Sequence, residues 1–119
     1  MVGISIKRGD IILVNFDPII GKEQGRTRPA IVIQNNISNI YSPTTIVAPI
    51  TSKIYSKEFP TNVQISSANS GLEKESTVLL NQIRAIDKSR VIKRISSLKD
   101  AEMRKVDLAI KVSLGLQNF

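Results

Sequence analysis

Two arginines and a proline lie close together in the stretch EQGRTRPA, between two apolar runs. Gly21 and Gly25 permit tight turns and let a ligand approach the backbone closely. Pro29 pushes Arg28 toward an extended conformation, so Arg28 stands where a strand begins. A guanidinium held in this way can present its planar fork to a phosphate, which makes Arg28 a candidate phosphate-binding residue. Arg26 would share its face in an extended chain, and the alternative for both arginines is ordinary solvated charge.

The composition restricts the chemistry that such a site can perform. The chain has no cysteine and no histidine, which excludes a thiol nucleophile and an imidazole base. Asp10, Asp17 and Glu23 are scattered acids, and the first two have the positions of turn residues. No metal motif is present, so we expect no metal and no cofactor. Cleavage of RNA suits this composition, because the substrate's own 2′-hydroxyl is the nucleophile and the protein aligns it and stabilises charge.

The net charge points to the same kind of partner. A formal charge of +7 favours nucleic acid first and a membrane surface second. The segment from Arg84 to Lys105 holds eight basic and three acidic residues, which is +5 of the total. This basic flank either faces phosphate or is a solvated surface, and both alternatives remain open. Aromatic residues make up 4% of the chain, which provides little for base stacking. The basic residues of the flank are Arg84, Lys88, Arg90, Lys93, Arg94, Lys99, Arg104 and Lys105.

The elements that would position these residues are short strands followed by one helix. With 119 residues, 41% of them apolar, we expect one domain over residues 1–119. Apolar runs and turn signals predict strands at 11–16, 30–34, 44–50, 61–65, 77–86 (one bent strand or two) and 91–95. From about residue 100 the apolar positions Met103, Val106, Ile110 and Leu114 have helical spacing. Leu114, Leu116 and Phe119 either cap the core or form a subunit interface.

The chain lacks an apolar run long enough to span a membrane and an N-terminal signal-peptide pattern. We therefore expect a cytoplasmic protein that makes no membrane contact.

Four segments in order resemble the MazF/PemK family of bacterial toxins. They are RGDIILVNFDPIIGKEQGRTRPAIVIQN, SPTTIVAPITS, LLNQIRAIDKSR and a C-terminal amphipathic helix ending in SLGL. The resemblance runs from about Lys7 to the end. It implies a small SH3-like β-barrel with a C-terminal α-helix, assembled as a homodimer. It also implies a sequence-specific, metal-independent endoribonuclease that cleaves single-stranded RNA, leaves 2′,3′-cyclic phosphate and 5′-hydroxyl ends, and is neutralised by an acidic, MazE-like antitoxin.

The resemblance assigns roles to particular residues. The family's catalytic arginine precedes the proline of the RP pair, which is Arg28 here, and its catalytic threonine ends the third strand, which is Thr51. Arg28 would stabilise the charge of the phosphorane and Thr51 would hydrogen-bond the scissile phosphate. The remaining substrate-binding residues implied are the loop residues Glu23, Gln24 and Gly25, then Gln82, which helps hold that loop, and Ser52.

Two rival functions use a similar fold. One is a toxin of the CcdB type, which binds gyrase and cleaves no RNA; such toxins lack the EQG-x-x-RP arginine and the context of Thr51. The other is an RNA-binding barrel without catalysis. The presence of both catalytic residues argues against this second rival. Motif specificity favours the nuclease, and the loss of cleavage in Arg28→Ala would separate the cases.

Overall fold

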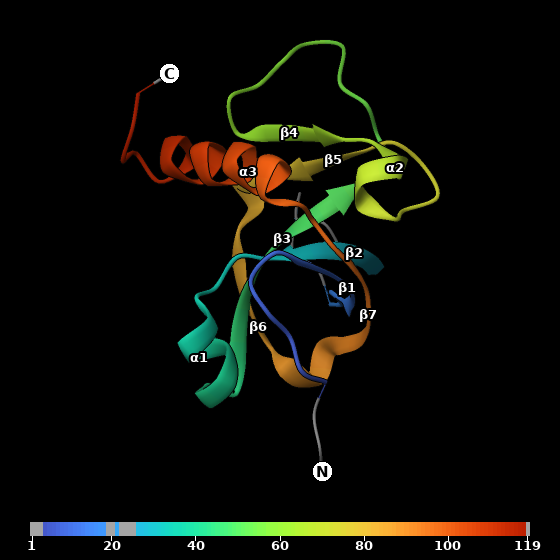
Figure 1. Ribbon diagram of the computed structural model, residues 1–119, viewed down its shortest axis with the longest axis vertical. Coiled ribbons are helices and arrows are strands. Elements are labelled where there is room, and N and C mark those ends of the chain that lie inside the picture. The colour runs from blue at the N-terminus through green and yellow to red at the C-terminus, as the bar shows by residue number, and fades with distance from the viewer. Residues whose placement is uncertain (1–3, 19–20, 22–25, 119) are drawn as a thin grey trace.

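The computed structural model describes residues 4–18, 21 and 26–118. Within them the chain forms seven strands, three α-helices and two 3₁₀ turns (Figure 1). The elements in order are β1 (Asp10–Asn15), β2 (Thr27–Val32), α1 (Asn36–Tyr41), β3 (Thr44–Thr51), β4 (Asn62–Ile65), α2 (Ser67–Ser70), β5 (Ser76–Leu79), η1 (Leu80–Gln82), β6 (Arg84–Asp87), η2 (Lys88–Arg90), β7 (Val91–Ser97) and α3 (Asp100–Ser113).

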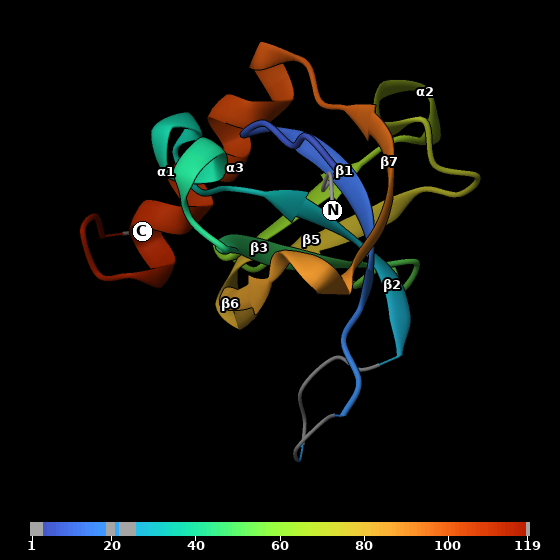
Figure 2. The same cartoon turned by 90° about the horizontal axis from the view of Figure 1, so that it is seen from below.

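The strands form one antiparallel sheet in the order β4-β5-β3-β2-β1-β7, with β6 paired to β3 (Figure 2). Strand β3 joins the two halves of the sheet, because its first half pairs with β6 and its last two residues pair with β5. The predicted mainly β fold with a C-terminal helix is confirmed. The word barrel applies loosely, since the pairings among the described residues end at β4 and β7. Helix α2 lies between these edges, and the Ser96 hydroxyl of β7 donates to the Ser70 carbonyl.

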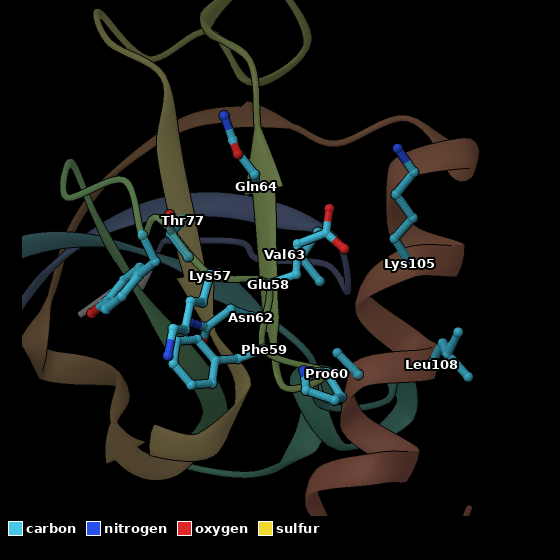
Figure 3. Close-up of a pocket in the computed structure, with 12 residues that line it drawn as sticks. Lys57, Glu58, Phe59, Pro60, Asn62, Val63, Gln64, Thr77, Lys105 and Leu108 are labelled. Carbon is cyan, nitrogen blue, oxygen red and sulfur yellow. The ribbon is translucent and has the colours of Figure 1, made fainter. Parts of the chain in front are cut away.

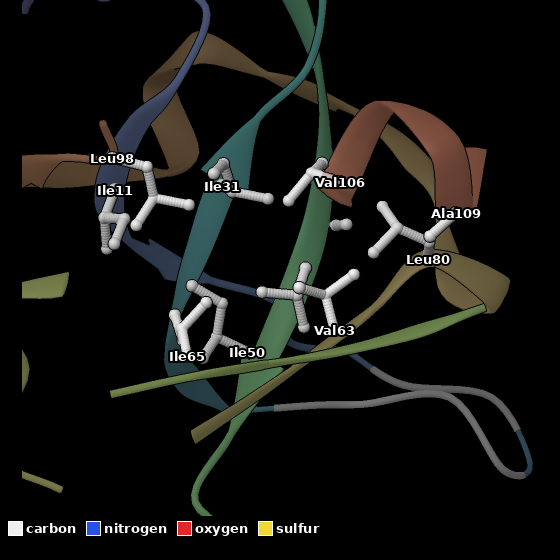
Figure 4. Packing of buried hydrophobic residues seen from close by; sticks show 11 residues of the cluster. Ile11, Ile31, Ile50, Val63, Ile65, Leu80, Leu98, Val106 and Ala109 are labelled. Atoms are coloured by element: carbon white, nitrogen blue, oxygen red, sulfur yellow. The ribbon is translucent and has the colours of Figure 1, made fainter. Parts of the chain in front are cut away.

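Alternation along the strands places apolar side chains on two faces of the sheet. One face, here called the α3 face, buries Ile11, Ile31 and Ile50 against Val106 and Ala109 of α3 (Figure 4). The other, here called the Phe16 face, buries Phe16 with further residues of β1, β2, β3, β6 and β7. Complete burial of one such side chain contributes roughly 1.5–3 kcal/mol to the free energy of folding. Two cores therefore hold the central strands from both sides.

Helix α3 has the predicted spacing but an exposed end. Val106 is completely buried, whereas Leu114 and Leu116 are 60% and 75% exposed. These two leucines therefore do not cap the core, and Phe119 lies outside the described residues. The helix is fastened to the N-terminal segment by an ion pair of 2.6 Å between the Arg8 guanidinium and the Asp107 carboxylate.

The structure differs from the sequence prediction in its small helices. The predicted segment 77–86 is two strands, β5 and β6, separated by the turn η1. Helix α1 was not predicted, because an asparagine that follows a strand is as typical of a turn as of a helix cap. The side chain of Asn35 in fact caps this helix, accepting the Ser38 amide at 2.8 Å. An asparagine favours both roles, so its identity alone did not decide between them.

Candidate active site

Arg28 lies inside strand β2, one residue after its start. It pairs with Val14 of β1, and directly opposite residues of an antiparallel pair share a face. Val14 belongs to the buried cluster of the Phe16 face. Strand alternation therefore directs the half-buried Arg28 side chain to the Phe16 face. The backbone of Arg28 is extended, as its position before Pro29 predicted.

Thr51 ends strand β3 and lies on the same face. Its side chain is buried, and its Oγ1 accepts the backbone amide of Lys53 at 3.2 Å. Strands β2 and β3 pair Ala30 with Pro49 and Val32 with Val47. The pairing of these two strands ends at Ala30 and Pro49. Arg28 and Thr51 each lie two residues beyond that pair, so strand alternation places both on its face of the sheet.

Gln82 closes the η1 turn that leads into β6, and it is half-buried. Two residues later, Arg84 pairs with Val47 of β3 and therefore also lies on the Phe16 face. The Arg84 guanidinium lies over the Phe16 ring at 5.4 Å from the ring centroid, a cation–π contact. Sequence reasoning placed Arg84 only in the basic flank. The alternation of β6 was the signal that could have assigned it to this face.

Ser52 follows Thr51 directly but does not lie on the Phe16 face with it. It is exposed and lines a groove of about 510 Å³ that also borders Arg28 and contains Lys74 and Lys93. Leu13 and Ile50, which belong to the α3-face side of their strands, line the same groove. The groove therefore meets the Phe16 face along the edge formed by residues 27–28 and 51–52. The predicted loop residues Glu23, Gln24 and Gly25 lie outside the described residues.

The base of the β1–β2 connection is held by several hydrogen bonds. The Phe16 amide donates to the Arg26 carbonyl at 2.8 Å, and the Arg26 amide donates to Asp17 Oδ1 at 2.7 Å. Asp17 thus acts as a turn residue, as predicted. Arg26 has a φ of 62°, so the chain is not extended from Arg26 to Arg28. The expectation that these two arginines share a face by strand alternation was wrong for that reason.

The basic flank divides into structural and unengaged cations. The Lys88 ammonium donates to the Asn39 carbonyl, and Arg90 donates to the carbonyls of Asn15 (3.1 Å) and Asp17. Arg94 lies 3.4 Å from Asp10. In the described part of the chain, Lys93 has no carboxylate within ion-pair distance. The flank is therefore neither wholly a phosphate surface nor wholly solvated charge.

The acids have structural contacts of their own. Asp10 is buried; its Oδ1 accepts the Ser97 hydroxyl at 2.6 Å and its Oδ2 accepts the Lys7 amide at 2.9 Å. No three Asp or Glu side chains in residues 4–18, 21 and 26–118 come together as a metal-binding group. The helices in these ranges include none of the length and apolar character needed to cross a bilayer.

A second groove, also of about 510 Å³, lies between α3, β4 and the β3–β4 connection (Figure 3). Phe59 and Leu108 line it and are 47% and 48% exposed. Lys105 and Leu108 approach from α3, while Val63 and Gln64 come from β4 (Figure 3). This groove contains neither Arg28 nor Thr51.

Comparison with known proteins identifies the family of the chain. Residues 7–114 match the model of a family described as PemK-like, MazF-like toxin of type II toxin–antitoxin systems. The chain is 47% identical to the endoribonuclease EndoA of Bacillus subtilis over 114 residues, covering 96% of this chain and 98% of that protein. It is 46% identical to the endoribonuclease MazF of Staphylococcus epidermidis, covering 96% and 95%.

Solved structures agree as well. The fold is similar to MazF of Deinococcus radiodurans, with a TM-score of 0.80, 26% identity and coverage of 94% and 98%. A MazE–MazF complex from the same organism matches with a TM-score of 0.75 and 25% identity, covering 96% and 99%. By its own sequence and by its fold, the chain belongs to the PemK-like, MazF-like family of type II toxin–antitoxin toxins.

Proposed function

We propose that the chain is a sequence-specific, metal-independent endoribonuclease that cuts single-stranded RNA. The observation that carries the proposal is the placement of Arg28 and Thr51 on one face of adjacent strands, in a member of a family whose relatives are named endoribonucleases. A bond forms between the 2′-oxygen and phosphorus while the bond from phosphorus to the 5′-oxygen breaks. The 2′-hydroxyl loses a proton and the 5′-oxygen gains one, leaving 2′,3′-cyclic phosphate and 5′-hydroxyl ends.

Each candidate residue then has a physical task. Arg28 stabilises the additional negative charge of the phosphorane, and the Thr51 hydroxyl hydrogen-bonds the scissile phosphate. Ser52 contacts a neighbouring phosphate, and Gln82 helps to hold the loop of Glu23, Gln24 and Gly25 beside the RNA. Because the nucleophile belongs to the substrate, the tasks assigned to the residues of this chain are alignment and charge stabilisation.

The partners follow from the family and from the charge. A MazE-like antitoxin with an acidic segment would cover the basic surface and block RNA. Support comes from the +7 charge and from a relative of 25% identity solved as a MazE–MazF complex. A homodimer of single-domain subunits is the proposed assembly, and the cytoplasm, where RNA is accessible, is the proposed location.

Cleavage in excess EDTA tests this proposal. Purified protein and its Arg28→Ala variant would each be incubated with a long RNA of known sequence, and every new end would be mapped. We expect discrete cuts with cyclic-phosphate ends, and a loss of at least about 100-fold in kcat/KM for Arg28→Ala with RNA affinity largely retained. A folded wild-type protein that makes no cuts would instead favour a gyrase-binding toxin or a binding-only role.

A further inference from the structure

Lys74 and Lys93 line a groove beside the candidate active site, and neither lysine has a role in the function proposed above. Along its edge the chain turns from the Phe16 face to the groove at Arg28 and again between Thr51 and Ser52. An RNA strand whose scissile phosphate lies at Arg28 and Thr51 has this groove on one side. A nucleotide that flanks the scissile phosphate would therefore lie next to this groove.

The charge of the groove suits a phosphate. Among the described residues, Lys74 and Lys93 are both exposed and neither has a carboxylate within ion-pair distance. Lys93 is thus distinguished from Lys88, Arg90 and Arg94 of the same flank, which have structural partners. Of the described residues that line the groove, Glu73 is the one acid, against three cations including Arg28. The balance is positive, and a lysine ammonium binds phosphate as a compact point charge.

The floor of the groove suits a base. Leu13, Ile95 and Leu72 are half-buried apolar residues that line it together with Pro29 and Ile50. A nucleotide presents an anionic phosphate and a flat base, and the groove offers cations beside an apolar surface. An acidic peptide with apolar side chains could use the same groups, so the position of the groove decides between them: Arg28 of the candidate active site also lines it, which favours RNA.

We propose that this groove is a subsite for the nucleotide next to the scissile phosphate, with Lys74 and Lys93 binding its phosphate and the apolar floor contacting its base. This inference rests on the proposed ribonuclease function. It also bears on the basic flank, because it assigns RNA contact to Lys93, one of the cations of that flank.

Binding measured over a range of NaCl concentrations tests the subsite. The probe is an RNA that contains the mapped cut site with a 2′-deoxy group at the scissile nucleotide, so that it binds without being cut. For single strands, the slope of log affinity against log salt falls by about 0.7 for each phosphate contact removed. We expect Lys74→Gln and Lys93→Gln each to lower the slope by about this amount and to weaken binding several-fold at low salt.

Lys7→Gln is the matched control, because it removes the same charge from an exposed residue six positions before Leu13. It should leave the slope unchanged. A second arm replaces single flanking phosphates by neutral methylphosphonates. One position should weaken wild-type binding several-fold and have little further effect in Lys93→Gln.

The outcomes separate the two proposals. Absence of RNA cleavage by the wild type would refute the ribonuclease function itself. Cleavage by the wild type, with both lysine variants keeping wild-type slopes and affinities, would overturn the subsite alone. If poly-glutamate inhibits RNA cleavage less in the lysine variants than in the wild type, while RNA binding is unchanged, the subsite would also be overturned. The groove would then be assigned to an acidic protein segment.

Discussion

Thr51 combines an observed structural contact with a proposed chemical role, and a single substitution would affect both. Its hydroxyl accepts the Lys53 amide at 3.2 Å, and in the proposed reaction it also donates to the scissile phosphate. A hydrogen bond to a charged group contributes about 1.5–3 kcal/mol. We therefore expect Thr51→Val to lower kcat/KM by roughly 10–100-fold, while Thr51→Ser, which keeps the hydroxyl, should stay within several-fold of wild type.

Thr45 provides the control for this prediction. It lies on the same strand and face, is completely buried, and donates to Asn39 Oδ1 at 2.8 Å. Thr45→Val should cost about 1 kcal/mol of folding free energy and leave cleavage unchanged. Urea denaturation and initial cleavage rates would be measured for all variants. Wild-type activity in Thr51→Val would remove the threonine from the proposed chemistry.

At the scale of elements, the end of β1 is fastened to the turn η2. Arg90 of η2 donates to the carbonyls of Asn15 and Asp17, and Asp87 caps the same turn by accepting the Ser89 amide. That bond lowers the pKa of the Asp87 carboxyl, so the cap stays ionised at neutral pH. The turn is thereby ordered, and it holds the strand that leads into the predicted RNA-binding loop.

Loss of the Arg90 hydrogen bonds should destabilise the β1–β2 hairpin locally and leave the overall fold intact. In Arg90→Gln we expect the amides of Phe16 and Arg26 to exchange with solvent about 10-fold faster, since one or two hydrogen bonds of about 1 kcal/mol each are lost. The kcat/KM for RNA should fall several-fold. Arg104→Gln, an exposed arginine on α3, removes the same charge as a control. Hydrogen exchange by NMR would detect the change, and equal rates in both variants would contradict this account.

Periodicity in the sequence located the strands and α3 because burial on one face leaves a regular pattern. The pattern around Arg28 also predicted its place at the start of a strand. Three features could not be predicted from hydrophobic periodicity. The short helix α1 depends on one capping side chain, the open edge of the sheet depends on contacts between Ser70 and Ser96, and the conformation of Arg26 depends on its bond to Asp17. Each is decided by a tertiary or local contact rather than by hydrophobic spacing.

At the scale of the whole molecule, several large apolar side chains remain exposed. Packing within a single chain does not account for their exposure. Phe59 and Leu108 face one groove (Figure 3), and Ile54 precedes it on the same connection. Leu114 and Leu116 at the end of α3 are exposed as well. Exposed apolar side chains such as these are typical of subunit contacts. This groove is therefore the surface where we expect the proposed homodimer to form.

Leu108→Glu tests that assignment, because it places a charge in the middle of the groove while Leu108 is 48% exposed and not needed for the core. We expect the variant to sediment as a monomer with an unchanged circular dichroism spectrum. The cost of burying an unpaired carboxylate in an interface exceeds what one lost apolar contact would cost. Ile37→Glu, on α1 and 73% exposed, should remain a dimer. Analytical ultracentrifugation at several concentrations distinguishes the two, and a dimer of undiminished stability in Leu108→Glu would exclude this groove as the interface.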